Sequence, residues 1–345
     1  MNYPQTNANI YSRYNPDASL LVEQRMFSAE NALDNDVVRY VKRAMNAVDE
    51  EYTHKTKEAG ENVKSHLKCL LNDVSYEYQG SVMTNTHIRG TSDIDLLVIC
   101  EKFQGTEISR VRQELQSTWK YNESQIRRLQ NYDSSFVPYL GNSKSDLAAL
   151  RWNIEQAMLK SYNICDISKA KAVKITNQHL HRDVDIVTAS WFQSLDYILD
   201  GMPDVKRGIK IYNKDTQFAE GPDYPFLSIK RINDRNAETN GRLKRMIRFL
   251  KNVRTDSEQK INLTSFDINA ICYSIPIADY YTLDYNGIVH LLWHTMYRLL
   301  SDNKQENLKS VVGNEYIFKG HSDKVEALKH LKNEVWGIYQ DLKNA

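Results

Sequence analysis

A short run with two carboxylates constrains this chain more than any other feature. Gly80-Ser81 is followed, after a polar loop, by Thr91-Ser92-Asp93-Ile94-Asp95-Leu96-Leu97-Val98-Ile99. The apolar tail predicts a buried strand, and successive side chains of a strand point to opposite faces of the sheet. We therefore expect Asp93 and Asp95 on one face and Ile94 and Leu96 on the other.

Two carboxylates side by side repel each other unless a cation lies between them. Mg²⁺ takes oxygen ligands and is commonly shared with substrate phosphates. Gly80 permits a tight turn with close backbone approach, and Ser81 offers an N–H and a hydroxyl to phosphate oxygens. This combination predicts nucleotidyl transfer with two Mg²⁺ ions, for which Mn²⁺ could substitute.

A third carboxylate is expected on a neighbouring strand. Asp185 lies between Val184 and Ile186, as an inward-facing carboxylate on a buried strand would. Asp183 shares its face but lies nearer the polar end, so we prefer Asp185 and keep Asp183 as the alternative. Taken alone, either residue could simply end a strand, but the Gly-Ser and Asp-Ile-Asp motifs favour a metal-binding role.

A basic helix is predicted at 242–253, where an apolar stripe recurs at helical spacing. Lys244, Arg248 and Lys251 lie on its flank. Such residues usually form a solvated face, but here they could clamp a triphosphate. Ser265 opens a later helix, where its hydroxyl and the helix N-terminus could bind the same phosphates.

Composition limits the remaining classes. The chain has 345 residues, 41% of them hydrophobic, and a net charge of +1. It therefore carries no general basic field for duplex nucleic acid. No apolar run is long enough to span a membrane. Four scattered cysteines indicate a reducing, cytoplasmic setting. His179 and His181 lack a convincing third ligand, so zinc is disfavoured.

The order of elements predicts an α+β fold in two lobes, with the active site in the cleft between them. Residues 1–20 would form an irregular arm, 21–225 the catalytic lobe with a mixed sheet, and 226–345 a helical lobe. We expect one long helix or two within 20–71, broken near Gly60. Further helices are expected at 266–275, 287–300 and 322–342, and a weak strand at 316–318.

The motifs resemble those of the bacterial cyclic GMP-AMP synthase-like (DncV-like) nucleotidyltransferases, the CD-NTases of CBASS anti-phage defence. The resemblance is carried by Gly80-Ser81, by 86–96, by the strand 184–189, and by 236–251 with Ser265-Phe266. It covers roughly residues 60–280. Thr188 stands where this family commonly has Pro, which removes no chemical group.

The resemblance implies a polymerase-β-like nucleotidyltransferase fold joined to a helical domain. The enzyme would join two NTPs, or three as in some relatives, release pyrophosphate and close the ring. Asp93 and Asp95 would hold both metals, and Asp185 would help to hold the catalytic one. Lys244, Lys251, Ser265, Gly80 and Ser81 would bind the nucleotide.

Further partners follow from the same resemblance. An operon-encoded effector would respond to the product, and conjugation machinery would act on Ala345, unless that residue is simply the end of a polar tail. Two other functions stay open on the sequence: a nucleotidyltransferase that modifies RNA or protein, and a catalytically silent scaffold. Base choice, linkage and ring size cannot be read from the sequence.

Overall fold

The computed structural model describes residues 3, 6–7, 34–90, 93–280 and 283–345. The arm expected at 1–20 and the start of the helix expected from residue 20 therefore lie almost entirely outside the described residues. The chain forms two compact units. Unit 1 comprises 1–50, 84–92 and 231–345, and unit 2 comprises 51–83 and 93–230. No described helix combines the length and apolar character needed to cross a membrane.

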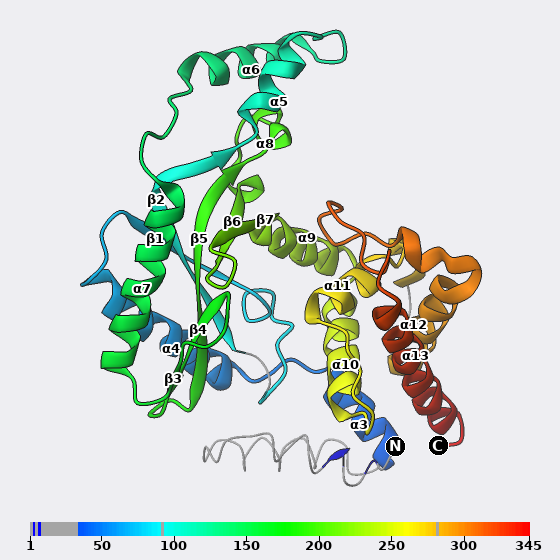
Figure 1. The fold of residues 1–345 in the computed structure, drawn as a ribbon. Helices are drawn as coiled ribbons and strands as arrows, with labels where there is room; N and C mark the ends of the chain where they lie inside the picture. Colours follow the sequence, from blue (N-terminus) through cyan, green and yellow to red (C-terminus); the bar gives the residue numbers. More distant parts are fainter. Residues whose placement is uncertain (1–2, 4–5, 8–33, 91–92, 281–282) are drawn as a thin grey trace. The chain divides into compact units, whose positions relative to one another are not determined.

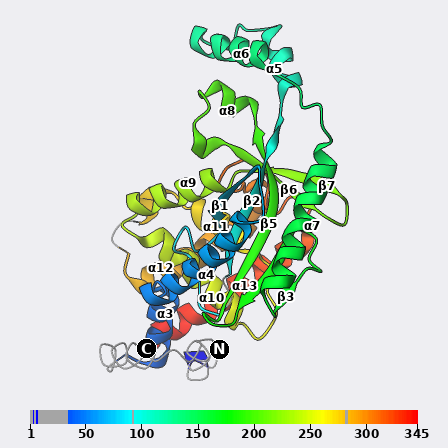
Figure 2. The same ribbon diagram turned by 90° about the vertical axis from the view of Figure 1, so that its left-hand side faces the viewer.

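Unit 2 is built on a mixed seven-stranded sheet, shown in Figures 1 and 2. Its main path runs β1-β2-β5-β4-β3, while β6 pairs with both β5 and β7. The strands are β1 (Val74–Gln79), β2 (Ile94–Thr106), β3 (Cys165–Asp166), β4 (Ala172–Asn177), β5 (Arg182–Gln193), β6 (Gly208–Asn213) and β7 (Phe218–Asp223). Only β2 and β5 pair in parallel among these strands, so the mixed sheet expected from the sequence is confirmed.

One face of this sheet is covered by two long helices, α4 (Glu50–Lys68) and α7 (Ser143–Ser161). Apolar side chains from both helices pack with Ile94, Leu96, Val184 and Ile186 in a single core. The other face carries a smaller apolar cluster that includes Leu97, Val187 and Ala189. The short helices α5 (Ile108–Leu115), α6 (Glu123–Ser135) and α8 (Leu195–Leu199) pack together at the carboxyl ends of β2 and β5.

The helix break expected near Gly60 is wrong. Helix α3 (Asp36–Met45) ends before Asn46, and Gly60 lies inside α4. A Cβ at Gly60 would lie 2.9 Å from the Tyr78 ring and 3.1 Å from Ile94. The glycine therefore serves close packing of α4 on the sheet, at the cost of some helix propensity.

Unit 1 is helical. Its core joins α3 to α10 (Arg242–Asp256), α11 (Ser265–Tyr273), α12 (Tyr285–Leu300) and α13 (Ser322–Lys343). The helices expected here are confirmed within a few residues at each end. The sequence placed α3 in the 21–225 lobe, but its buried side chains pack with those of the C-terminal helices. Helix α9 (Pro225–Glu238) spans the boundary between the two units. The strand expected at 316–318 is only an isolated bridge between Lys309 and Tyr316.

Candidate active site

Asp95 and Asp185 are direct partners in the parallel pairing of β2 with β5. Partners in register present their side chains on the same face of a sheet. Their neighbours Ile94, Leu96 and Ile186 are buried in the core on the opposite face. The predicted alternation is therefore confirmed, and the two carboxylates share the face that α4 and α7 leave uncovered.

Gly80 follows β1 directly and adopts a left-handed backbone with φ +84°. Gln79, the residue before it, is paired with Asp95. A Cβ built at position 80 would collide with Oδ2 of Asp95. The sequence assigned Gly80 to close backbone approach, and in the structure the group that it approaches is a carboxylate of the candidate site.

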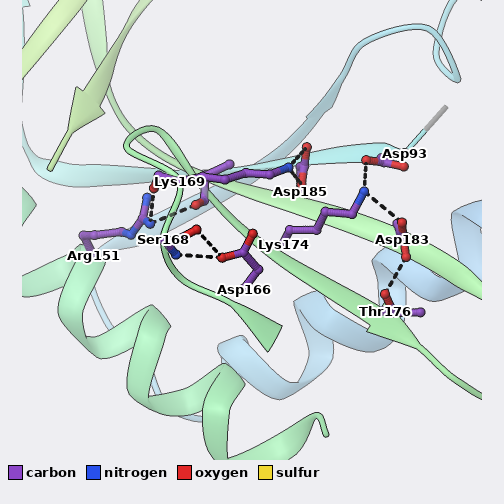
Figure 3. Close-up of polar contacts among 10 residues, drawn as sticks. Asp93, Arg151, Asp166, Ser168, Lys169, Lys174, Thr176, Asp183 and Asp185 are labelled. Carbon is purple, nitrogen blue, oxygen red and sulfur yellow. Dashed lines mark hydrogen bonds and ion pairs between the residues drawn. The ribbon is translucent and has the colours of Figure 1, made fainter. Parts of the chain in front are cut away.

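Asp93 lies one residue before β2, and its carboxylate is engaged by a lysine. Nζ of Lys174 lies 2.6 Å from Oδ2 of Asp93 and 2.8 Å from Oδ2 of Asp183 (Figure 3). The Thr176 hydroxyl donates a 2.6 Å hydrogen bond to the Oδ1 of Asp183. Lys174 therefore bridges Asp93 and Asp183, which lie two residues before Asp95 and Asp185 in the sequence.

A second lysine engages Asp185. Nζ of Lys169 lies 3.2 Å from the Oδ1 of this carboxylate. The turn that carries Lys169 is anchored by Arg151, which is buried in α7 and donates hydrogen bonds to the carbonyls of Lys169 and Ala172 at 2.9 and 2.8 Å. The position of Lys169 is thus fixed from the core of unit 2.

Sequence reasoning missed both lysines, although a signal for one was present. In β4, Val173 and Ile175 are buried in the core while Lys174 lies between them. Strict alternation places Lys174 on the face opposite that core, and its register partner is Asp185. The pairing of β4 with β5 could not be read from one sequence, so the lysine could not be assigned to the carboxylates.

The electrostatics of the site favour a cation. Burial raises the pKa of Asp93, the charges of Asp185 and Asp183 raise it further, and the ammonium of Lys174 opposes both. For Lys174 itself, burial lowers the pKa, but the ion pairs with Asp183 and Asp93 outweigh burial and raise it. Carboxylates gathered on one face, with oxygen as the only ligand atom, fit Mg²⁺.

The described residues contain no group of three or more His, Cys, Asp or Glu side chains already gathered closely enough to hold a metal ion. The carboxylates are paired with Lys174 and Lys169 instead. The assignment of Asp93, Asp95 and Asp185 as metal ligands therefore stays a prediction. His179 and His181 lie in the turn between β4 and β5 and belong to no such group.

The predicted phosphate-binding side chains Lys244, Lys251 and Ser265 lie in unit 1. Lys251 is 1% exposed and donates a 2.9 Å hydrogen bond to the carbonyl of Thr86. Arg248 is also buried and donates to the carbonyls of Met45 and Asn85 at 2.9 and 2.7 Å. The alternative of a fully solvated basic face is therefore wrong for these two residues.

The environment of the basic helix changes its pKa values. Burial and the neighbouring Arg245 lower the pKa of Arg248 to about 10. Burial and Arg248 also lower the pKa of Lys244, which is half-buried. Both shifts arise first from burial and then from a neighbouring like charge, so a bound anion would stabilise the charged forms. Nucleotide binding by Lys244 and Lys251 stays a prediction.

Ser265 is the first residue of α11, as the sequence predicted. Thr264 caps this helix, with Asp267 completing a capping box. Asp267 is fully buried and also pairs with Lys324 at 2.8 Å. The N-terminus of α11 is thus held in place by its capping residues. The phosphate contact of Ser265 stays a prediction.

Comparisons with known proteins bear on the family and the fold of the chain. Residues 230–340 match the model of the cGAS/DncV-like nucleotidyltransferase C-terminal helical domain. A c-di-GMP synthase of Lachnospiraceae bacterium (strain RUG226) is 66% identical over 331 residues, which cover 96% of each chain.

Two solved structures resemble the chain over its whole length. The STING-associated CdnE c-di-GMP synthase from Capnocytophaga granulosa superposes with a TM-score of 0.81 at 44% identity, covering 100% of this chain and 99% of the other. The STING-associated CdnE c-di-GMP synthase from Flavobacteriaceae sp. gives a TM-score of 0.86 at 34% identity, with the same coverage. The expected α+β nucleotidyltransferase fold with a helical C-terminal domain is confirmed.

Proposed function

This chain belongs to the bacterial CD-NTase family of cyclic dinucleotide synthases, and we propose that it joins two molecules of GTP into cyclic di-GMP. The observation that carries the choice of GTP is full-length similarity to proteins named c-di-GMP synthases, one of them 66% identical. The ring would form by two transfers, each attaching the α-phosphate of one nucleotide to a ribose hydroxyl of the other and releasing pyrophosphate.

We propose that Asp93, Asp95 and Asp185 hold two Mg²⁺ ions. The in-register pairing of Asp95 with Asp185 and the raised pKa of Asp93 support this set. When bound, Mg²⁺ would favour deprotonation of the attacking hydroxyl and stabilise the charge on the leaving pyrophosphate. Gly80 keeps the space beside Asp95 free of a side chain, so backbone and carboxylate can both face the phosphates.

We propose that Lys174 and Lys169 neutralise the carboxylates in the metal-free protein. Each ammonium compensates carboxylates that would otherwise repel one another across the sheet face. Since both lysines contact carboxylates of the candidate metal site, binding of divalent cations becomes an exchange of one cation for another. We expect these ion pairs to stabilise the carboxylate face in the metal-free protein.

Lys244, Lys251 and Ser265 are proposed to contact the nucleotide triphosphate, with Gly80 and Ser81 on the catalytic unit. The burial and the neighbouring like charges of the basic helix support this role, because a bound anion would stabilise the charged forms. Lys251 also has a structural role, because its ammonium holds the carbonyl of Thr86. Any phosphate contact of Lys251 would have to coexist with that hydrogen bond or replace it.

The biological setting is also proposed. Two structural relatives are described as STING-associated, so we propose that the product activates a STING-type effector in anti-phage defence. Conjugation at Ala345 stays a separate prediction, to be tested by a higher-mass species that an Ala345→Glu change abolishes when the neighbouring genes are co-expressed.

The test is a product assay. The purified chain is incubated with the four labelled NTPs and Mg²⁺, and the phosphatase-resistant product is identified by mass spectrometry. Cyclic di-GMP formed from GTP alone supports the proposal, and a different cyclic dinucleotide refutes the choice of GTP. Label on RNA or protein, or absence of turnover, would instead favour the macromolecule-modifying or scaffold alternatives.

A further inference from the structure

A groove of about 670 Å³ lies at the carboxyl ends of β2 and β5 in unit 2. Both strands carry the candidate metal ligands near their amino ends, so the groove lies at the opposite end of the same strands (Figures 1 and 2). At a rise of about 3.3 Å per residue, the groove residues of β2, which run from Glu101 to Thr106, lie roughly 20–35 Å from Asp95 along the strand. The groove is therefore distinct from the candidate active site.

One part of the groove is apolar and open to water. Its lining includes Phe103, Phe136, Val137 and Tyr139. Val137 is 81% exposed and Tyr139 is 42% exposed. Rings and aliphatic side chains gathered at the wall of a concave surface are typical of ligand sites, where they cover the flat parts of a bound molecule.

The groove lining also contains two guanidinium groups, those of Arg128 and Arg207. Arg207 lies over the Trp191 ring, 4.1 Å from its centroid, and its Nη2 donates to Gln104 at 3.1 Å. Arg128 donates a 2.6 Å hydrogen bond to the carbonyl of Leu199. Neither arginine forms an ion pair with any residue that the structure describes.

One nitrogen of the Arg207 guanidinium group also lacks a hydrogen-bond partner within the described part of the chain. Its Nε is buried and has no hydrogen-bond acceptor among the described residues. Buried donors are normally satisfied, so such a group marks a place where an acceptor is missing. Both guanidinium groups are half-buried and held by neutral partners, which leaves their positive charge available to an anion.

The other charged groups of the lining do not cancel this field. Glu101 is the only carboxylate among the groove residues, and its Oε1 accepts a 2.8 Å hydrogen bond from the Trp191 indole. Lys102 adds a third cation, paired with Asp146 at 3.2 Å. The groove lining thus combines positive charge with aromatic rings.

We propose that this groove binds a cyclic dinucleotide, the class of molecule that the chain itself makes. Such a ligand presents two phosphates on a rigid ring, with a flat base on each side. Arg128 and Arg207 match the phosphates, and the aromatic wall matches the bases. The identity of the ligand rests on the proposed function, whereas the presence of an anion-binding aromatic groove does not.

The test is titration of the full chain with cyclic di-GMP by calorimetry. The variants are Arg207→Gln, Arg128→Gln and Phe136→Ala, and the matched control is Arg127→Gln, which alters an exposed arginine on the same helix outside the groove. We expect each groove variant to weaken binding at least tenfold and the control to bind as the wild type does. Thermal unfolding of every variant shows that the fold is retained.

The outcomes separate this proposal from the proposed function. Wild-type affinity in the folded groove variants overturns the groove assignment, whatever the product assay gives. If the product assay identifies another cyclic dinucleotide, the same titration is run with that product, so the two proposals can fail independently. If the groove variants lose GTP binding but still bind the cyclic dinucleotide as the wild type does, the groove assignment is also overturned.

Discussion

The carboxylate of Asp95 occupies the place that a Cβ at Gly80 would take. We therefore expect Gly80→Ala to abolish cyclic dinucleotide synthesis, because the new methyl group must displace a proposed metal ligand. The measurement is product formation by mass spectrometry, together with the unfolding midpoint.

Gly313 provides the matched control for this variant. It has the same φ of +84°, but a Cβ there would meet nothing within 4 Å. Gly313→Ala should therefore cost only the strain of a left-handed alanine, about 1 kcal/mol of unfolding free energy, and keep full activity. Equal activity in both variants would show that the close approach of position 80 to Asp95 is not needed for catalysis.

Asp93→Asn and Asp95→Asn should each remove product formation while the protein stays folded. When Asp93 loses its charge, Lys174 still pairs with Asp183, so the lysine keeps a compensating carboxylate. Asp183→Asn, on the same strand as Asp185, should retain most activity if Asp185 is the third ligand. Normal turnover in a variant with asparagine at both Asp93 and Asp95 would refute their assignment as metal ligands.

Lys174→Met should lower the thermal stability of the metal-free protein. The raised pKa of Lys174 means that its ion pairs contribute fully at neutral pH, and that this contribution is lost only as the pH rises above roughly 10. Addition of Mg²⁺ should then raise the unfolding midpoint of this variant more than that of the wild type, because the divalent cation replaces a missing charge.

The control is Lys171→Met, which removes an exposed lysine of the same hairpin that pairs with Glu220 at 2.6 Å. It should leave the stabilisation by Mg²⁺ unchanged. An equal response to Mg²⁺ in Lys174→Met and wild type would mean that lysine and metal do not compete for the carboxylates.

Lys251→Ala should weaken GTP binding more than Lys244→Ala, by on the order of 1.5–3 kcal/mol for one charge-assisted contact. Because Lys251 also holds the carbonyl of Thr86, its substitution should lower the unfolding free energy as well. Calorimetric titration with GTP in the presence of EDTA and chemical denaturation separate the two effects. Unchanged GTP affinity with reduced stability would leave Lys251 a structural role only.

Thr188→Val should stabilise unit 2 by about 1 kcal/mol. Thr188 is fully buried in β5, and its hydroxyl has no partner among the residues described. Thr176→Val is the control, because that hydroxyl donates to Asp183 and its loss should destabilise. Denaturation of both variants measures the difference, and a less stable Thr188→Val would indicate an unobserved acceptor.

Local patterns in the sequence were sufficient to predict the carboxylate strands. Alternation predicted that Asp95 and Asp185 each point away from the apolar side chains beside them, and the burial of Ile94, Leu96, Val184 and Ile186 in one core confirms it. The same kind of pattern predicted α10 and the start of α11. These features depend on neighbours a few residues apart, which one sequence records.

Features that depend on distant contacts could not be predicted. Gly60 suggested a helix break because glycine is a poor helix former, whereas close packing on Tyr78 explains it. Lys251 was predicted as a phosphate contact, with a solvated surface position as the alternative; its burial against the carbonyl of Thr86 depends on a residue far away in the sequence. Lys174 could be recognised only once β4 was known to pair with β5.

The division of the chain has a consequence for its synthesis on the ribosome. All residues of unit 2 have been translated once Lys230 is made, whereas the core of unit 1 joins α3 to helices that are made last. Domains generally fold as units during synthesis. The carboxylate strands can therefore assemble while the partners of α3 are still missing. A nascent chain would then carry the proposed metal ligands before α10 and α11, with Lys244, Lys251 and Ser265, have been made.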